Sequence, residues 1–232
     1  MKKSLLFILL FLLFWGCSHS EKSDDAKQPA AVAKAETLAT GDLLFVGIPG
    51  NYNLEGISSA IADATGYGDT NFIHTAIIEV DGDGQAWIID ATLKRGVARY
   101  PIDTFLTDFT LNDGSLPALV VMRLADTTGC SRFVANAKGF LGEPYDAYFT
   151  PDNDKHYCTE LVYDAYIRDG KHLFTARPMN FKNADGEFPL YWTQLFHAIG
   201  AKIPQDELGT NPQEMRMEPV LKRVNIDIAA VR

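Results

Sequence analysis

Two apolar segments joined by a glycine-rich turn place the strongest constraint on the fold of this chain. Residues 72–80 (FIHTAIIEV) and 85–92 (QAWIIDAT) are rich in β-branched and aromatic residues, as strands are. The sequence Asp-Gly-Asp-Gly lies between them and is typical of a hairpin turn. Strands joined by so short a loop must be antiparallel. We therefore expect these two segments to form an antiparallel hairpin.

The remaining segments predict further short strands with helices outside them. This grouping of strands, with helices outside them, indicates the α+β class rather than a doubly wound parallel sheet. Gly170 is expected to end the helix that begins at Cys158. The expected strands are 41–47, 97–100, 117–124 and 220–228, and the expected helices are 54–65, 101–108, 131–141, 158–169 and 189–199, with a further helical turn near 210–212.

Cys158 is the first chemically distinctive residue of this pattern. Cys158, Val162 and Ala165 follow one another at i, i+4 and i+7, so the thiol lies on the apolar face of the predicted helix. The position is the first turn, where the helix dipole and unpaired backbone N–H groups favour a thiolate. These features are typical of a nucleophilic cysteine. The alternative is a small core residue without chemistry.

A thiol nucleophile needs a base and a group that orients the base. Of the five histidines, only His74 lies inside an apolar strand, where its polar ring needs a partner. Asp90 lies on the returning strand and shares a face with His74 if the hairpin loop has three or five residues. With a four-residue loop Asp90 faces the other side. Glu79 is the rival orienting residue, although the period of two in a strand turns it away from His74.

Five short motifs, in this order, resemble those of a known group of enzymes. They are GDLLF at 41–45, HTAII at 74–78, IIDAT at 88–92 followed by Gly96 and Val97, GEPYD at 142–146, and YCTELV at 157–162. The order resembles that of the circularly permuted NlpC/P60 papain-like superfamily, in its YiiX/YebB-like branch of bacterial amidases or peptidases. The resemblance covers about residues 41–170.

The resemblance implies a permuted papain-like fold, with an antiparallel sheet or small barrel packed against the nucleophile helix. It implies Cys158 as nucleophile, His74 as base and Asp90 as the third polar residue, with no cofactor. This branch usually has glutamate in the third position. The shorter aspartate must lie closer to the imidazole, so the choice between Asp90 and Glu79 stays open at this stage.

The implied activity is hydrolysis of an amide bond, with peptides of the bacterial cell wall as the expected substrates. Tyr157 and Tyr145 are candidate substrate-binding residues, with plain aromatic packing as the alternative. Two other functions are considered: an acyl hydrolase for lipid amides or esters, and an inactive envelope protein that binds ligands in the same cleft. A metal site using Cys158, His156 and His74 is disfavoured, because their spacing matches no standard zinc motif.

The first sixteen residues predict an export signal. Lys2 and Lys3 precede an apolar run at 5–15 that is too short to span a bilayer as a mature helix. Gly16 and Cys17 follow and resemble the end of a bacterial lipoprotein signal, which implies that Cys17 carries the lipid. An ordinary secretory peptide is the alternative, since Trp15 is bulky for a residue just before the cleavage point. Residues 17–40 are small and charged and predict a flexible tether, which leaves 41–232 as the catalytic domain.

The net charge and the number of cysteines limit the kinds of partner and of covalent cross-link that we expect. The net charge is −9 and no basic run is present, which argues against binding nucleic acid. Cys130 and Cys158 are the two cysteines after Cys17, too few for a disulfide framework. We expect a protein anchored by lipid in the cell envelope, most simply at the outer membrane, whose other partner is a peptide or amide substrate.

Overall fold

The computed structural model describes residues 36–50, 52–66, 68–151 and 153–231, which lie in one compact unit, Ala35–Arg232. The predicted export signal, the lipidated Cys17 and most of the predicted tether lie outside the described residues. The last residues of the predicted tether pack on the sheet: the Thr40 hydroxyl donates to the Val80 carbonyl at 3.0 Å, and Arg123 donates to the Thr37 carbonyl at 2.8 Å.

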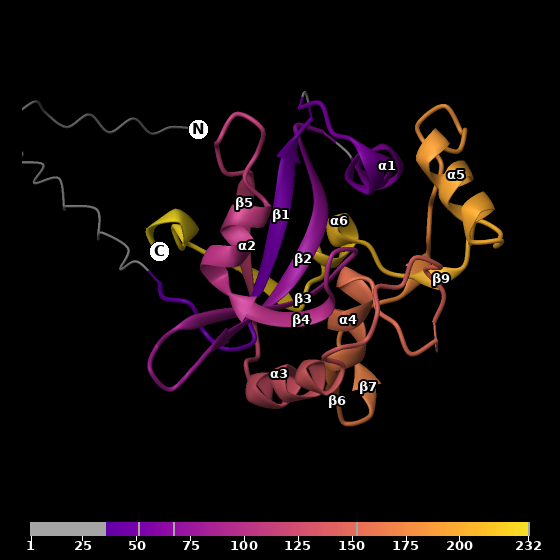
Figure 1. Cartoon of the computed structure of the whole chain (residues 1–232). Helices are drawn as coiled ribbons and strands as arrows, with labels where there is room; N and C mark the ends of the chain where they lie inside the picture. Colours follow the sequence, from indigo (N-terminus) through magenta and orange to yellow (C-terminus); the bar gives the residue numbers. More distant parts are fainter. Residues whose placement is uncertain (1–35, 51, 67, 152, 232) are drawn as a thin grey trace, which may run out of the picture. The chain divides into compact units, whose positions relative to one another are not determined.

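A six-stranded sheet forms the centre of the unit (Figure 1). The strand order is β10-β5-β1-β2-β3-β4, and every neighbouring pair is antiparallel, including the predicted hairpin of β2 and β3. Among the described residues, two small two-stranded sheets, β6–β7 and β8–β9, lie outside this sheet. The strands are β1 (Leu43–Pro49), β2 (Thr70–Val80), β3 (Ala86–Thr92), β4 (Gly96–Pro101), β5 (Ala118–Leu124), β6 (Ile167–Arg168), β7 (Lys171–His172), β8 (Arg177–Pro178), β9 (Leu208–Gly209) and β10 (Leu221–Val224).

Helices complete a mixed α/β architecture, and each lies where the sequence predicts one to within a few residues, apart from one end discussed below. Among the described residues, no helix has both the length and the apolar character needed to cross a membrane. The helices are α1 (Gly56–Thr65), α2 (Ile102–Asp108), α3 (Cys130–Gly139), α4 (Cys158–Ala165), α5 (Leu190–Ala198) and α6 (Pro212–Met215), with a 3₁₀ turn at Ile228–Val231.

The sheet is apolar on both faces, and different helices cover them. Ile77 and Ile89 belong to a core cluster that includes Leu161 and Val162 of α4. Their neighbours in sequence point the other way, and Ile78 belongs to a cluster with residues of α2. Each buried side chain of this size stabilises the fold by about 1.5–3 kcal/mol relative to an exposed one. The two layers therefore fix α4 and α2 on the sheet.

The hairpin between β2 and β3 has a five-residue loop, since Val80 pairs with Ala86. The Asp81 carboxylate holds the loop by accepting the N–H groups of Asp83 and Gln85 at 3.0 and 2.9 Å. A loop with an odd number of residues puts His74 and Asp90 on one face. The backbone pairing between β2 and β3 extends from the Val80–Ala86 pair to the Ile77–Ile89 pair.

The end of α4 differs from the sequence prediction. The helix ends at Ala165 rather than continuing to Gly170. Tyr166 is fully buried and its hydroxyl donates to the Gly41 carbonyl at 3.1 Å, which draws the chain out of the helix. Asp169 and Gly170 have positive φ angles of 51° and 73° and form the turn between β6 and β7. The glycine therefore makes a hairpin turn and does not cap the helix.

Gly96 ties the segment before α4 to the sheet. Val97 donates its N–H to the Glu143 carbonyl at 2.8 Å, and Gly142 donates to the Val97 carbonyl at 2.9 Å. Gly96 itself has φ +64°, and a Cβ atom at this position would lie 2.3 Å from the Glu143 carbonyl oxygen. The left-handed backbone and the close approach of another chain segment both require glycine here.

We expect Gly96→Ala to lower the free energy of unfolding by at least about 2 kcal/mol, because the left-handed backbone and the steric contact both penalise a side chain. Urea denaturation of the purified domain measures this change. Gly82→Ala is the matched control, since a Cβ there meets no atom within 4 Å, and it should stay within about 0.5 kcal/mol of the wild type. Equal stability of the two variants would contradict the proposed role of Gly96.

Candidate active site

Cys158 is the first residue of α4, with Tyr157 in extended conformation before it (φ −91°, ψ 171°). The Tyr157 N–H donates to the Glu160 carboxylate at 3.2 Å, which satisfies a backbone donor at the start of the helix. Cys158 is buried, and the buried apolar residues Leu161, Val162 and Ala165 follow it in α4. The thiol is therefore held at the positive end of the helix dipole.

His74 and Asp90 are joined by a short hydrogen bond. The distance from His74 Nε2 to Asp90 Oδ2 is 2.9 Å, and Asp90 is fully buried. The expected contact between these residues is thus confirmed. Glu79, the rival, lies elsewhere and accepts from Arg99 and Lys138 at 2.6 Å each. Of the two carboxylates left open by the sequence, Asp90 is the one beside the imidazole.

Tyr100 of β4 holds Asp90 from the other side and was missed by the sequence reasoning. Its hydroxyl lies 2.8 Å from both carboxylate oxygens and donates to them. Burial, and then the negative charge of Asp90, raise the pKa of Tyr100, so this hydroxyl keeps its proton. The register of β3 and β4 would have predicted this contact: Asp90 pairs with Ala98, and Tyr100 is the next residue of β4 on the same face.

Helix α2 packs aromatic rings on the imidazole. The Phe109 ring stacks on His74 with centroids 4.8 Å apart and an angle of 29°, and the Phe105 centroid lies 6.1 Å away. These contacts and the Asp90 bond leave His74 little freedom to rotate, and they shield it from water. The ring is therefore fixed with Nε2 on Asp90 and Nδ1 free for another partner.

Cys158 interacts electrostatically with the His74 ring. Burial by itself would lower the pKa of His74, but the negative charge of Cys158 and the bond to Asp90 outweigh it and raise the pKa to about 10. The two residues meet beyond the Ile77–Ile89 pair, where β2 and β3 are no longer paired, and they line one cavity. The raised pKa keeps the His74 ring positively charged beside Cys158 at neutral pH.

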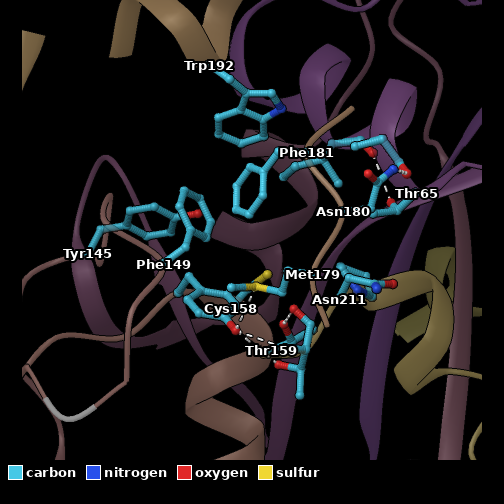
Figure 2. Close-up of a pocket in the computed structure, with 15 residues that line it drawn as sticks. Thr65, Tyr145, Phe149, Cys158, Thr159, Met179, Asn180, Phe181, Trp192 and Asn211 are labelled. Carbon is cyan, nitrogen blue, oxygen red and sulfur yellow. Dashed lines mark hydrogen bonds between the residues drawn. The ribbon is translucent and has the colours of Figure 1, made fainter. Parts of the chain in front are cut away.

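Two cavities meet at Cys158. The first, of about 50 Å³, is mainly apolar, and Figure 2 shows aromatic side chains gathered on one side of the cysteine. The second, of about 350 Å³, is lined by His74 and by charged residues of the β3–β4 turn. The first is lined by Tyr145, Phe149, Tyr157, Met179, Phe181 and Trp192 among others, and the second by Lys94, Arg95, Tyr100, Asp108 and Phe109 among others.

The two predicted substrate-binding tyrosines lie at the site in different ways. Tyr145 lines both cavities, and burial together with the charge of Cys158 raises the pKa of its hydroxyl. Tyr157 lines the first cavity with its ring, while its hydroxyl accepts the Thr210 N–H at 3.0 Å. The lining residues Phe181 and Trp192 were missed, because they come from a part of the chain without a recognisable motif.

His156 lies near Cys158 in sequence but points to other partners. Its Nδ1 lies 2.7 Å from the Glu143 carboxylate and its Nε2 lies 3.3 Å from that of Asp164. Its pKa is raised, because these carboxylates outweigh the effect of burial. Both ring nitrogens are thus engaged away from the thiol. In the part of the chain that the structure describes, no group of three His, Cys, Asp or Glu side chains is arranged to hold a metal ion.

Cys130, the second cysteine of the domain, lies at the start of α3. It is free and buried, and burial raises the pKa of its thiol. Its other charged neighbours are Asp42 and Asp126, which act in the same direction, and Arg123 and Arg168, which oppose it. Cys130 therefore contrasts with Cys158, which lies beside a histidine.

The strand that carries His74 precedes the helix that carries Cys158, which is the chain order of a permuted papain-like fold. Residues 37–225 match the family model described as "Permuted papain-like amidase enzyme, YaeF/YiiX, C92 family", and the chain belongs to this family.

Two relatives from Escherichia coli are similar to it. The uncharacterized protein YiiX of strain K12 is 29% identical over 192 residues, which cover 80% of this chain and 85% of that protein. The crystal structure described as metalloprotein YiiX from strain O157:H7 has a TM-score of 0.62 at 24% identity and covers 82% of this chain and 97% of that one. This likeness shows the shared fold; the metal in its description belongs to that protein.

We expect the His74 ring to remain protonated through neutral pH and to titrate near pH 10. NMR titration of ¹⁵N-histidine-labelled protein, assigned with His74→Gln, measures this. Cys158→Ser should lower the titration midpoint because the thiolate is removed, whereas Cys130→Ser should leave it unchanged. Since the folded pKa is raised above the unfolded value of about 6.5, this proton stabilises the fold fully below that value and loses its effect as the pH rises through about 10. A midpoint near 6.5 in the wild type would refute the electrostatic effect of Cys158 and Asp90 on His74.

Proposed function

We propose that this protein is a cysteine hydrolase that cleaves amide bonds with Cys158, His74 and Asp90. The observation that carries the proposal is the continuous line of interactions from Cys158 through His74 and Asp90 to Tyr100 beside two cavities. The family description, an amidase, supports the reaction class. Each residue has a distinct part in the reaction.

In the first half of the reaction, the Cys158 thiolate attacks the carbonyl carbon of the amide. The carbonyl becomes a tetrahedral oxyanion, which the backbone N–H of Cys158 can stabilise because donors in the first helical turn have no acceptor within the helix. The His74 imidazolium then gives its proton to the nitrogen. The C–N bond breaks, the amine leaves, and a thioester joins the acyl group to Cys158.

In the second half, neutral His74 takes a proton from water, and the resulting hydroxide attacks the thioester. The C–S bond breaks, the carboxylic acid leaves, and the thiolate and imidazolium are restored. Asp90 fixes the ring and stabilises its positive charge in both halves. Tyr100 holds Asp90 by donating to both of its oxygens.

The first cavity favours peptides over long-chain lipids as substrates. Its volume of about 50 Å³ has room for roughly four water-sized groups, far fewer than the methylenes of a fatty acyl chain. A short apolar side chain fits this space. We therefore propose a peptide amide as substrate, with cell-wall peptides as the class that agrees with an envelope location.

We expect Cys158 to be the reactive thiol of the folded protein. At pH 6, iodoacetamide should alkylate Cys158 well ahead of Cys130, because the His74 imidazolium stabilises the Cys158 thiolate. His74→Ala should slow this reaction, and Cys158→Ala should lower hydrolysis of muramyl peptides at least about 10³-fold. Peptide mapping by mass spectrometry and product analysis by chromatography measure the two effects.

Two carboxylate variants serve as a matched pair in the same assays. Asp90→Asn should reduce hydrolysis, because the imidazolium loses its negative partner. Glu79→Gln should not reduce hydrolysis in this way, because the Glu79 carboxylate does not touch His74. A denatured sample controls for the accessibility of the two cysteines. Slow and equal labelling of both thiols, unchanged by His74→Ala, would leave the inactive binding protein as the better description.

We also propose that the enzyme works in the cell envelope, held there by lipid on Cys17. The support is the sequence of residues 1–17, which lie outside the described residues. Cys17→Ser should abolish incorporation of radiolabelled palmitate and move the protein from the membrane fraction to the soluble fraction in a bacterial host. If the wild type incorporates no palmitate and Cys17→Ser does not change the fractionation, an ordinary secretory signal is favoured instead.

A further inference from the structure

The second cavity carries a positively charged group that the proposed triad does not use. Arg95 and Lys94 follow β3 in the turn to β4, and both bind the carboxylate of Asp108 at the end of α2. The Lys94 ammonium lies 3.0 Å from Asp108 and is largely exposed, while Arg95 forms its ion pair with the other carboxylate oxygen. Two cations thus share one anion, so the group has one positive charge in excess.

Arg95 is held in place as arginines of carboxylate-binding sites are. Its guanidinium lies over the Tyr100 ring at 4.6 Å from the centroid, and its Nη1 pairs with Asp108. The side chain is 23% exposed, and none of its nitrogens belongs to the buried, unpartnered polar atoms of the described residues. Its remaining donors therefore face accessible space, where a planar fork can bind a carboxylate at two points.

The position of Arg95 relates it to one half of the substrate. Arg95, His74 and Cys158 line the same cavity. His74 lines this second cavity and is not among the lining residues of the apolar one. His74 must protonate the leaving nitrogen, so the amine half of the substrate lies on its side and the acyl half lies toward the apolar cavity.

We propose that Arg95, assisted by Lys94, binds a carboxylate on the leaving amine. The substrate class is then an amide whose amine half is an amino acid or peptide with a free carboxylate, joined to an acyl half with a short apolar group. This inference rests on the proposed function and names its substrate. In the bond change, the proton of the His74 imidazolium goes to the amide nitrogen, the C–N bond gives way to the C–S bond of the thioester, and the carboxylate-bearing amine departs.

Charge makes this preference selective. The chain has a net charge of −9, so a carboxylate is repelled by most of the surface at long range. A local excess of positive charge beside Cys158 offsets this repulsion where the carboxylate must bind. A neutral amide of the same shape has no carboxylate and therefore gains no electrostatic attraction from Arg95.

Two small alkylating reagents test the site without knowledge of the substrate. Iodoacetate carries a carboxylate and iodoacetamide does not, and both react with the same thiolate of Cys158. In the wild type the ratio of the iodoacetate rate to the iodoacetamide rate should be higher at Cys158 than at the thiols of the denatured protein. Arg95→Gln should lower the ratio at Cys158 about fivefold, Arg95→Lys should lower it less, and Lys94→Gln should have the smallest effect.

Lys222→Gln is the matched control, because it removes one positive charge from exposed β10 at the far edge of the sheet. It should leave the ratio unchanged. A second measurement compares hydrolysis of a short peptide with hydrolysis of the same peptide as its C-terminal amide: Arg95→Gln should raise KM for the free acid and not for the amide.

The outcomes separate this inference from the proposed function. A reactive Cys158 whose ratio is the same in wild type, Arg95→Gln and Lys222→Gln would overturn the carboxylate site and leave the hydrolase intact. An equal fall in Arg95→Gln and Lys222→Gln would also overturn it, since the effect would then come from overall charge. An unreactive Cys158 in the wild type would overturn the proposed function itself.

Discussion

The buried carboxylate of Asp90 is the interaction on which the site depends. A charge with no exposure to water is tolerated only if it is paired, and Asp90 is paired on both sides, by the His74 ring at 2.9 Å and by the Tyr100 hydroxyl at 2.8 Å. Removing either partner would leave a buried charge short of a hydrogen bond. The same contacts fix the imidazole so that its other nitrogen is available to Cys158. One set of hydrogen bonds therefore satisfies a buried carboxylate and positions the imidazole for the proposed reaction.

The sheet serves the site because its two faces are covered by different helices. Helix α4, packed through residues such as Leu161 and Val162, brings the thiol from one layer, and α2 brings Phe109 against the imidazole from the other. The layers meet where β2 and β3 cease to pair beyond Ile77 and Ile89. The second cavity, which His74 and Cys158 line, lies at this point, where the proposed reaction takes place. The cavity on the β3–β4 side also contains the cations that we infer to select the substrate.

The chain order of the site follows from the family to which the protein belongs. His74 and Asp90 precede Cys158, as a circular permutation of the papain-like arrangement requires. The E. coli structure shares this fold at 24% identity, a level at which core patterns persist although most side chains differ. The third polar residue is an aspartate here. Tyr100 and the close β2–β3 hairpin bring its shorter side chain within reach of the ring.

The sequence by itself determined the hairpin, the antiparallel sheet, the position of most helices and the identity of Cys158, His74 and Asp90 as candidates. These features depend on local patterns: periodicity, turn residues and polar side chains in apolar segments. It did not decide between Asp90 and Glu79, since that choice depends on a loop length one residue longer than the glycine-rich turn suggests. It also extended α4 to Gly170, because the buried bond from Tyr166 to Gly41 joins residues 125 positions apart. Tyr100, Arg95 and the aromatic cavity were likewise decided by the tertiary structure, because strand register and long-range packing place them at the site and no local pattern records either.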